Sequence, residues 1–289
     1  MHINMKYYVV TIGAIFISLG IGMLVGFNLN YDQELSKQQS QIIEDLDTKF
    51  ENLRKTNNEL EVSLKELSTN YDKTIEYINT NSDKLISEEL TDKNIGIISI
   101  NTNVYDKDIE DSINKANGNI VFNITLNSNI TDKETLNNVS GKVGVELKST
   151  EEFISYISDC LKNEGSKDVL EYLQELNALT LNKLEENYNS YTSVVLSTDS
   201  NAKDNKSQFE SIDKLLIEKL KLEKKYLIAV ESSDTKTSDI ELYTDNKVAT
   251  IDNINQGSGK LALVLALKDG STIGKFGISD SADSLIPYD

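Results

Sequence analysis

An uncharged run near the start of the chain limits what the protein can be more than any other feature. Residues 7–27 (YYVVTIGAIFISLGIGMLVGF) contain no charged side chain over 21 positions. At about 1.5 Å per residue, such a helix spans the roughly 30 Å hydrocarbon core of a bilayer. The main alternative is a cleaved signal peptide, whose apolar stretch usually has about 7 to 15 residues before a small-residue cleavage site. This run is longer and lacks that site, so we predict a retained transmembrane helix over residues 7–27.

Charges on the two sides of this segment predict its orientation. Lys6 and the α-amino group precede the apolar run, whereas Asp32 and Glu34 follow it. Positive charges favour the cytoplasmic side of a membrane. We therefore predict a cytoplasmic N-terminus at residues 1–6, a single pass through the cell membrane, and an extracytoplasmic globular domain.

Small side chains recur every four residues along the predicted membrane helix. A face of small residues lets two helix backbones approach closely. The alternative is that glycine is simply frequent in membrane helices. We interpret the face as a dimer contact formed by Ala14, Ser18, Gly22 and Gly26.

The next segment predicts a coiled coil over residues 28–92. Neither glycine nor proline occurs between Asn28 and Ile95. Mostly apolar residues recur there with spacings of three and four, the pattern of a coiled-coil interface. We predict a parallel homodimer with its interface centred on Leu46, Phe50, Leu53, Asn57, Leu60, Leu64 and Leu67, within a stripe that runs from Ile43 to Leu85 through Tyr71, Thr74, Ile78 and Asn81. Asn57 would fix the register. The alternative is a long amphipathic helix folded back on the globular part.

Residues 93–289 predict a globular α/β domain. Short apolar runs, many of them β-branched, are typical of buried strands. Capping-box spacing at Thr131, Ser149 and Ser207 indicates the starts of helices between them. Because strands and helices alternate, the sheet is expected to be parallel. Residues 149–187 are helical in pattern, and residues 197–206 read as a surface loop. The predicted strands are 95–100, 120–126, 191–196, 226–230 and 248–251.

Composition argues against several classes of site. The chain has 47 acidic and 29 basic residues, a net charge of -18, which disfavours nucleic-acid binding. After Arg54 there is no His, Arg, Met or Trp, and Cys160 is the only cysteine. Imidazole ligands, guanidinium clamps and an intramolecular disulfide are therefore excluded from the globular part. No spacing singles out a catalytic pair, so we predict a protein that is not an enzyme and has no catalytic or cofactor-binding residue. Cys160 is expected to be a small buried hydrophobe.

Nucleotide-binding motifs are incomplete in this chain. The turn after the first predicted strand (NTNVYD) has no glycine where a dinucleotide fingerprint needs several. Gly259-Lys260 resembles the end of a phosphate-binding loop, but Ile254 and Leu261 occupy positions that require glycine and a hydroxyl residue. We predict a tight turn into a buried helix at residues 257–259, with an anion-binding helix N-terminus as the alternative.

Both ends of the chain resemble the MctB family, described as copper transporters. Residues 6–26 (KYYVVTIGAIFISLGIGMLVG) are similar to the start of its members. The family tail reads D-N-[IV]-D-x-x-x-G-x-x-A-L-V-L-A-L and then G-x-Y-G, from which Asn255 and Phe276 depart. The matching tail residues include Asp252, Asn253, Gly259, Ala262 and Leu263.

The resemblance implies a membrane-anchored envelope protein with a role in copper homeostasis or efflux. Mycobacterial members are described as keeping intracellular copper low and as envelope channels. Corynebacterial relatives, called SteB, are described as anchored coiled-coil partners of a cell-wall hydrolase system. Copper is implied by the family alone. Cu(I) prefers thiolate and thioether ligands, and Cys160 is the only side chain of either kind in the outer domain, so the residues themselves do not indicate a copper site. We expect a dimeric scaffold. The alternative is a SteB-like scaffold for hydrolase or division machinery, with an envelope protein partner and no direct copper role.

Overall fold

Two compact units make up the chain. The computed structural model describes residues 5–101, 106–197, 205–235 and 238–288. Their contacts divide the protein into Met1–Asp72 and a globular unit, Lys73–Asp289. Helix α1 (Met5–Leu85) belongs to both, because its last turns lie within the globular unit. This division by contacts falls within the segment 28–92 that the sequence predicts to be a coiled coil.

Helix α1 is unbroken over 81 residues. Its interior contains no proline, and no glycine follows Gly26, so nothing in its later part interrupts the backbone hydrogen bonds. Among the described residues, Met5–Asn28 is the one segment long and apolar enough to cross a membrane. The predicted apolar helix and the long helix that follows it are both confirmed.

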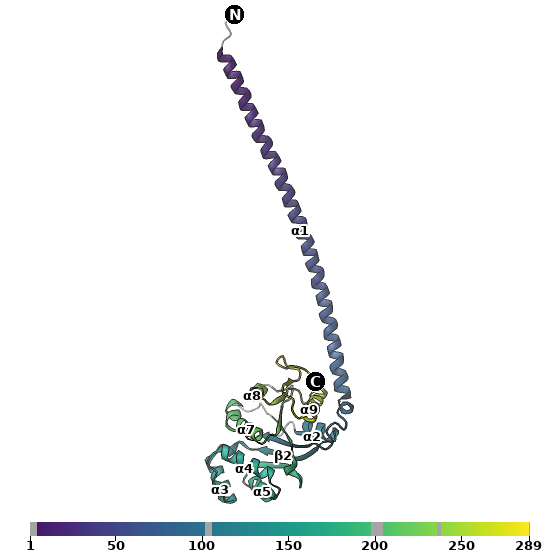
Figure 1. Ribbon diagram of the computed structural model, residues 1–289, viewed down its shortest axis with the longest axis vertical. Helices are drawn as coiled ribbons and strands as arrows, with labels where there is room; N and C mark the ends of the chain where they lie inside the picture. Colours follow the sequence, from purple (N-terminus) through teal and green to yellow (C-terminus); the bar gives the residue numbers. More distant parts are fainter. Residues whose placement is uncertain (1–4, 102–105, 198–204, 236–237, 289) are drawn as a thin grey trace. The chain divides into compact units, whose positions relative to one another are not determined.

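The globular unit is built on one sheet of seven strands in the order β3-β2-β1-β4-β5-β6-β7. Its helices, among them α4, α7 and α9, surround this sheet (Figure 1). Neighbouring strands are parallel except β2 and β3, which are antiparallel. The α/β class and the mainly parallel sheet are confirmed, and each predicted strand lies within two residues of an observed one. The strands are β1 (Asn94–Ile100), β2 (Asn119–Leu126), β3 (Leu179–Leu184), β4 (Ser193–Ser197), β5 (Tyr226–Val230), β6 (Ala249–Ile251) and β7 (Lys275–Phe276).

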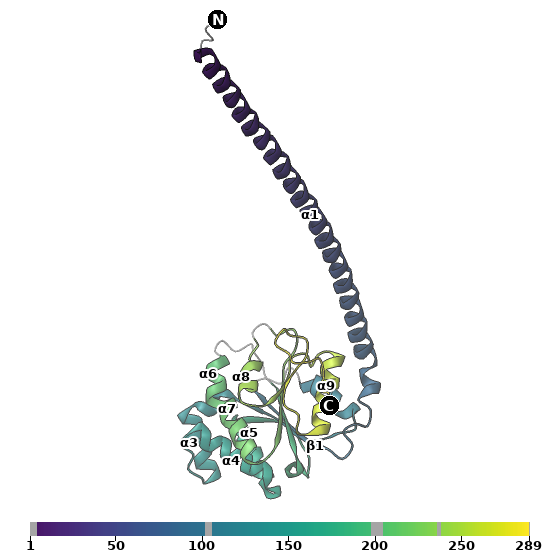
Figure 2. The ribbon, with the colours of Figure 1, turned by 45° about the horizontal axis from the view of Figure 1, so that its top comes forward.

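Helices cover both faces of the sheet (Figure 2). On one face lie α3 (Lys133–Val143), α4 (Thr150–Lys162), α5 (Lys167–Glu175), α6 (Asn205–Gln208), a π-helical turn (Phe209–Asp213), α7 (Lys214–Leu222) and α8 (Ile240–Asp245). On the other lie α2 (Asp106–Lys115) and α9 (Gly257–Asp269). Short 3-10 turns occupy Ser128–Thr131, Glu164–Ser166 and Tyr188–Ser190.

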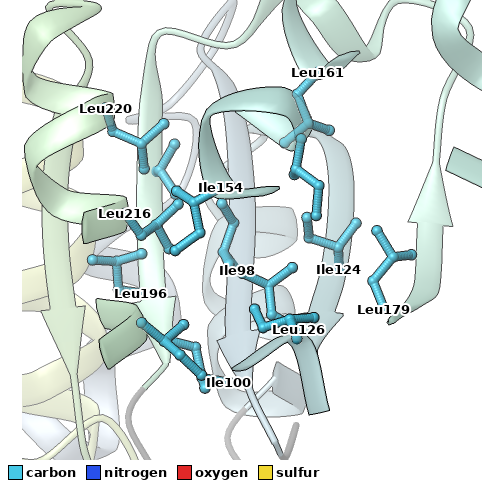
Figure 3. Close-up of a cluster of buried hydrophobic side chains, with 14 of the residues drawn as sticks. Ile98, Ile100, Ile124, Leu126, Ile154, Leu161, Leu179, Leu196, Leu216 and Leu220 are labelled. Atoms are coloured by element: carbon cyan, nitrogen blue, oxygen red, sulfur yellow. The ribbon is translucent and has the colours of Figure 1, made fainter. Parts of the chain in front are cut away.

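Two buried apolar clusters hold these layers together. In the first, Ile154 of α4 and Leu216 of α7 pack over Ile98 of β1 (Figure 3). The second joins the opposite face to α2 and α9. Because β1 is covered on both sides, its apolar run is continuous instead of alternating, which explains why the sequence revealed this strand.

Several local predictions were wrong. Residues 149–187 are not helical throughout, because they include the edge strand β3. Ser149 does cap α4, its Oγ accepting from the Glu152 backbone N–H at 3.2 Å. By contrast, α3 follows Asp132 instead of Thr131, and Ser207 lies inside α6. Of the predicted loop 197–206, the first residue ends β4 and the last two are helical, while the rest lies outside the described residues.

The end of α1 is part of the globular fold. Ile78 packs against the second apolar cluster, and Ile86, just after the helix, is fully buried. Asn79 Oδ1 accepts a hydrogen bond from the Ser258 backbone N–H at 2.9 Å. A Cβ at Gly257 would lie 2.6 Å from Asn79 Cα, so the two helices touch. The N-terminus of α9 is thus packed against α1, and its Ser258 N–H already has an acceptor. The predicted turn into a buried helix is confirmed.

Replacing Asn79 with alanine should destabilise the globular unit. The change leaves the Ser258 backbone N–H, in the first turn of α9, without its acceptor. Losing this hydrogen bond should lower the free energy of unfolding by about 1 to 2 kcal/mol. Urea unfolding of residues 73–289, followed by circular dichroism, measures the difference. The exposed neighbour Thr80→Ala is the matched control and should leave stability unchanged or slightly higher. Equal stability for both variants would contradict a capping role for Asn79.

Candidate functional site

The small residues predicted to form a membrane contact lie on one face of α1. A Cβ built at Gly22 or Gly26 meets no atom within 4 Å. The Ser18 hydroxyl donates to the Ile15 carbonyl at 2.9 Å, so its polar group is satisfied inside its own helix. With Ala14, these residues leave a shallow face that a second helix backbone can approach.

The predicted coiled-coil positions form an exposed apolar stripe on α1. Phe50 is 60% exposed and Leu67 is 67% exposed, although both are large apolar side chains. Leu46, Leu53, Leu60 and Leu64 are exposed in the same way. Fully burying one such side chain stabilises a protein by about 1.5 to 3 kcal/mol. A single chain gains only part of this stabilisation along the stripe.

The stripe does not continue unchanged to Leu85. Ile78 is partly buried against the globular unit, so its side chain is already in contact within the same chain. Ser82, one turn further on, is 6% exposed. The predicted interface positions of α1 therefore stay exposed only as far as about Thr74. The predicted coiled-coil interface, which we call the seam, was expected to continue to Leu85.

The first part of the tail motif fastens the end of the chain to the sheet. Asp252 follows β6, and its two carboxylate oxygens accept from the backbone N–H groups of Ile278 at 2.8 Å and Ser279 at 3.0 Å. Gly277 has a φ of 140°, and a Cβ there would lie 1.8 Å from Asp252 Oδ1. Glycine is required because the backbone approaches the carboxylate so closely.

The second part of the motif forms the turn from β6 into α9. Asn253 is fully buried, and its Nδ2 donates to Ser258 Oγ at 2.9 Å. A Cβ at Gly259 would lie 2.0 Å from the Asn253 carbonyl oxygen. Ala262 and Leu263 are fully buried in the second apolar cluster. All five tail residues therefore stabilise the connection from β6 to α9 or the packing of α9 itself.

The two departures from the family tail are compatible with this junction. Asn255 Oδ1 accepts from the Ser233 N–H and hydroxyl, each at 3.1 Å, and an aspartate oxygen would accept both equally well. Phe276 is 6% exposed and belongs to the second cluster. A phenylalanine ring keeps the apolar contact that a tyrosine ring would make there.

Cys160 is buried in the first apolar cluster, as predicted. Burial raises the pKa of its thiol, although hydrogen bonds with Tyr156 and Ser166 partly oppose this. A search of the described residues finds no group of three or more His, Cys, Asp or Glu side chains that could hold a metal ion.

Sequence reasoning missed two buried carboxyl groups near the carboxyl ends of the strands. Asp213, at the end of the π-helical turn, accepts from the Tyr243 hydroxyl, and burial raises the pKa of Asp213 to about 7. Glu231 directly follows β5, and burial raises its pKa to about 7 as well. A signal for Glu231 was present, because an acid directly after a buried strand lies at the edge where open α/β sheets place ligands.

These features define a class: an α/β protein with a doubly covered, open sheet, joined to a long helix that begins with an apolar segment of membrane-spanning length. The chain belongs to the MctB family, whose model, described as copper transport outer membrane protein, matches residues 2–287. A search of curated proteins finds no match.

Proposed function

We propose that this protein is a single-pass, dimeric scaffold of the cell envelope that carries its α/β unit outside the cytoplasmic membrane. The exposed apolar stripe from Ile43 to Tyr71 is the main support. Stripes of this period on a helix are buried against partner helices in coiled coils. Neighbouring charges such as Lys55 and Glu59, 4.0 Å apart, fit the solvated side of such a rod.

A second copy of this chain is the partner that best fits the stripe. Both chains would be anchored in the same membrane, so their rods run in the same direction and a parallel pair is the natural assembly. The face of Ala14, Ser18, Gly22 and Gly26 extends the pairing into the bilayer. Asn57 within the seam favours a fixed register, since an unpaired amide is costly among apolar side chains.

The anchor and its orientation are part of the same proposal. Lys6 precedes the apolar segment, and Glu34 and later acidic residues follow it, which supports an orientation with the globular unit outside the cytoplasm. Protease added to intact protoplasts should then remove the globular unit and leave the anchor protected. Protection of residues 100–289 until the membrane is opened would contradict the topology.

A direct role in copper handling is the second candidate, and the family description favours it. Physical chemistry favours an indirect role, because a tight Cu(I) site gathers soft ligands, and Cys160 is the only cysteine of the chain and is buried. Carboxylates of this acidic chain are expected to hold Cu(II) only loosely. If the role is indirect, any effect of this protein on cellular copper arises through an envelope partner.

Titration of the reduced fragment 30–289 against a competing Cu(I) chelator separates the two candidates. We expect no stoichiometric copper to be retained. A site with one copper per chain or per dimer that survives competition, and that is lost in Cys160→Ser, would make direct copper binding the better explanation.

A further inference from the structure

A cavity of about 550 Å³ lies at the edge of the sheet where β1, β4 and β5 begin. Its described lining includes Lys93 before β1, Ser193 at the start of β4, and Lys224 and Lys225 before β5. Small-molecule sites commonly have volumes of about 300 to 1,000 Å³, so the size suits a small ligand. The tail motif and the apolar stripe of α1 do not account for this cavity.

Three lysines give the cavity a positive lining in a chain that is acidic as a whole. Lys93, Lys224 and Lys225 reach it from two separate segments of the chain. Among the described residues, none of the three forms an ion pair with a carboxylate. By contrast, lysines elsewhere in the globular unit are paired, as Lys115 is with Asp83 at 2.7 Å. The charge of these three ammonium groups is therefore available to a ligand.

Two carboxylates in the lining offset this charge only in part. Asp269 Oδ2 already accepts hydrogen bonds from the Ser271 N–H at 3.1 Å, the Ser271 hydroxyl at 2.8 Å and the Thr272 hydroxyl at 2.7 Å. Asp92 is exposed to solvent. Three ammonium groups face two carboxylates, and one of these carboxylates is occupied in closing its own turn.

Lys225 is the best-positioned cation of the lining. Its side chain is partly buried, and its Nζ donates to the Tyr191 carbonyl oxygen at 2.6 Å and lies 3.8 Å from the centre of the Tyr191 ring. Burial lowers the pKa of Lys225, Glu223 opposes this effect, and Lys162 adds to it. Glu223 is itself paired with Lys162, at 3.0 Å between Oε1 and Nζ. An ammonium group has three donors, so a held Lys225 can still bond an anion.

A phosphate group suits this lining. Near neutral pH a phosphate ester carries close to two negative charges and offers three strong acceptor oxygens. Hydrogen bonds between ammonium groups and phosphate are among the stronger ones in proteins. The hydroxyls of Thr192 and Ser193 also line the cavity and supply further donors. The volume leaves room for an organic substituent beside the phosphate.

We propose that this cavity binds the phosphate group of a small compound between Lys93, Lys224 and Lys225. The hydroxyls of Thr192 and Ser193 orient the bound group. The site belongs to the globular unit alone, so it is independent of the dimer and of the anchor.

The test measures binding to the detergent-solubilised full chain by isothermal titration calorimetry at low ionic strength. Glycerol 3-phosphate and inorganic diphosphate are the probes, and glycerol and potassium chloride of equal ionic strength are their controls. We expect saturable binding of at least one probe, weakened by about 0.5 M potassium chloride because salt screens exposed charges. Binding of diphosphate alone would identify the ligand as an inorganic anion, and binding of glycerol 3-phosphate would identify it as a phosphate ester.

Two results of this titration would overturn the proposal. One is the absence of saturable binding of either probe up to about 10 mM. The other is equal binding of glycerol 3-phosphate and glycerol, because the phosphate group would then contribute nothing.

Lys224→Asn separates ligand binding from stability. Lys224 has a φ of 58°, a left-handed conformation that asparagine adopts more readily than lysine. Asn177 occupies the corresponding position in the turn before β3, where its N–H bonds the Gln174 carbonyl as the Lys224 N–H bonds the Lys221 carbonyl. The variant should therefore unfold in urea at the same concentration or a higher one, while the affinity for phosphate falls at least about fivefold.

Lys247→Asn is the matched control. Lys247 has a φ of 54° in the corresponding turn before β6 and is not among the described lining residues. This variant should change stability in the same direction as Lys224→Asn and bind phosphate as the unchanged chain does. An equal loss of affinity in Lys247→Asn would overturn the proposal. So would unaltered affinity in the double variant Lys93→Gln, Lys224→Asn with its fold intact by circular dichroism.

Discussion

Replacing Leu60 and Leu64 with glutamate should turn the soluble fragment 30–289 from a dimer into a monomer. Both side chains are more than half exposed in a single chain, and both lie in the proposed seam. A parallel pair would bring four new carboxylates together between the helices. Burying an unpaired charge costs several kcal/mol per ion. This cost exceeds the free energy of association that the neighbouring apolar pairs of the seam provide. Light scattering coupled to size-exclusion chromatography measures the mass directly.

The control for this prediction places the same charges on the opposite side of the helix. Val62 and Thr69 are exposed and lie outside the seam, seven residues apart. The double variant Val62→Glu, Thr69→Glu should therefore stay dimeric. A wild-type fragment that is already monomeric at tens of micromolar, or a control that also dissociates, would remove the coiled-coil proposal. The globular unit should keep its unfolding transition in every variant, since it begins at Lys73.

Replacing Gly259 with alanine should cost about 3 kcal/mol or more of the stability of the globular unit. The new methyl group would lie 2.0 Å from the Asn253 carbonyl oxygen and 2.7 Å from its Oδ1. Backbone must move to relieve this contact. The turn resists such movement because Asn253 is fully buried and bonded to Ser258. Urea unfolding of residues 73–289 gives the free energy.

Gly141→Ala is the matched control for that experiment. Gly141 lies inside α3, and a Cβ there meets no atom within 4 Å. Alanine is favoured over glycine in a helix by about 0.5 to 1 kcal/mol, so this variant should be more stable than the unchanged unit. If Gly259→Ala and Gly141→Ala shifted stability in the same direction, close packing would not be the reason for glycine in the tail motif.

The strands that the sequence predicted share one property, which is burial on both faces. Such strands read as continuous β-branched runs, as in β1 and β5. β3 was missed because it is a leucine-rich edge strand, half-buried, whose conformation depends on pairing with β2. β7 has only two residues and no detectable period.

The candidate sites were less predictable, because they depend on contacts between distant parts of the chain. Nothing near Asn79 in the sequence indicates that its side chain caps a helix that starts at Gly257. Likewise, Asp213 lies in an amphipathic segment, and its hydrogen-bond partner Tyr243 comes from α8, 30 residues further along the chain. The apolar stripe of α1, by contrast, was visible because it is a local periodic pattern.

The burial of Cys160 makes the rest of the molecule accessible to site-directed labelling. A maleimide reacts with the thiolate form, and a thiol that is 5% exposed with a raised pKa supplies little of it. No other cysteine occurs in the chain. A cysteine introduced at an exposed position outside the dimer interface, such as Val62 or Thr69, would therefore be the one reactive thiol per subunit. Spin labels or fluorophores attached there would report the separation of two rods in a native membrane without any further substitution.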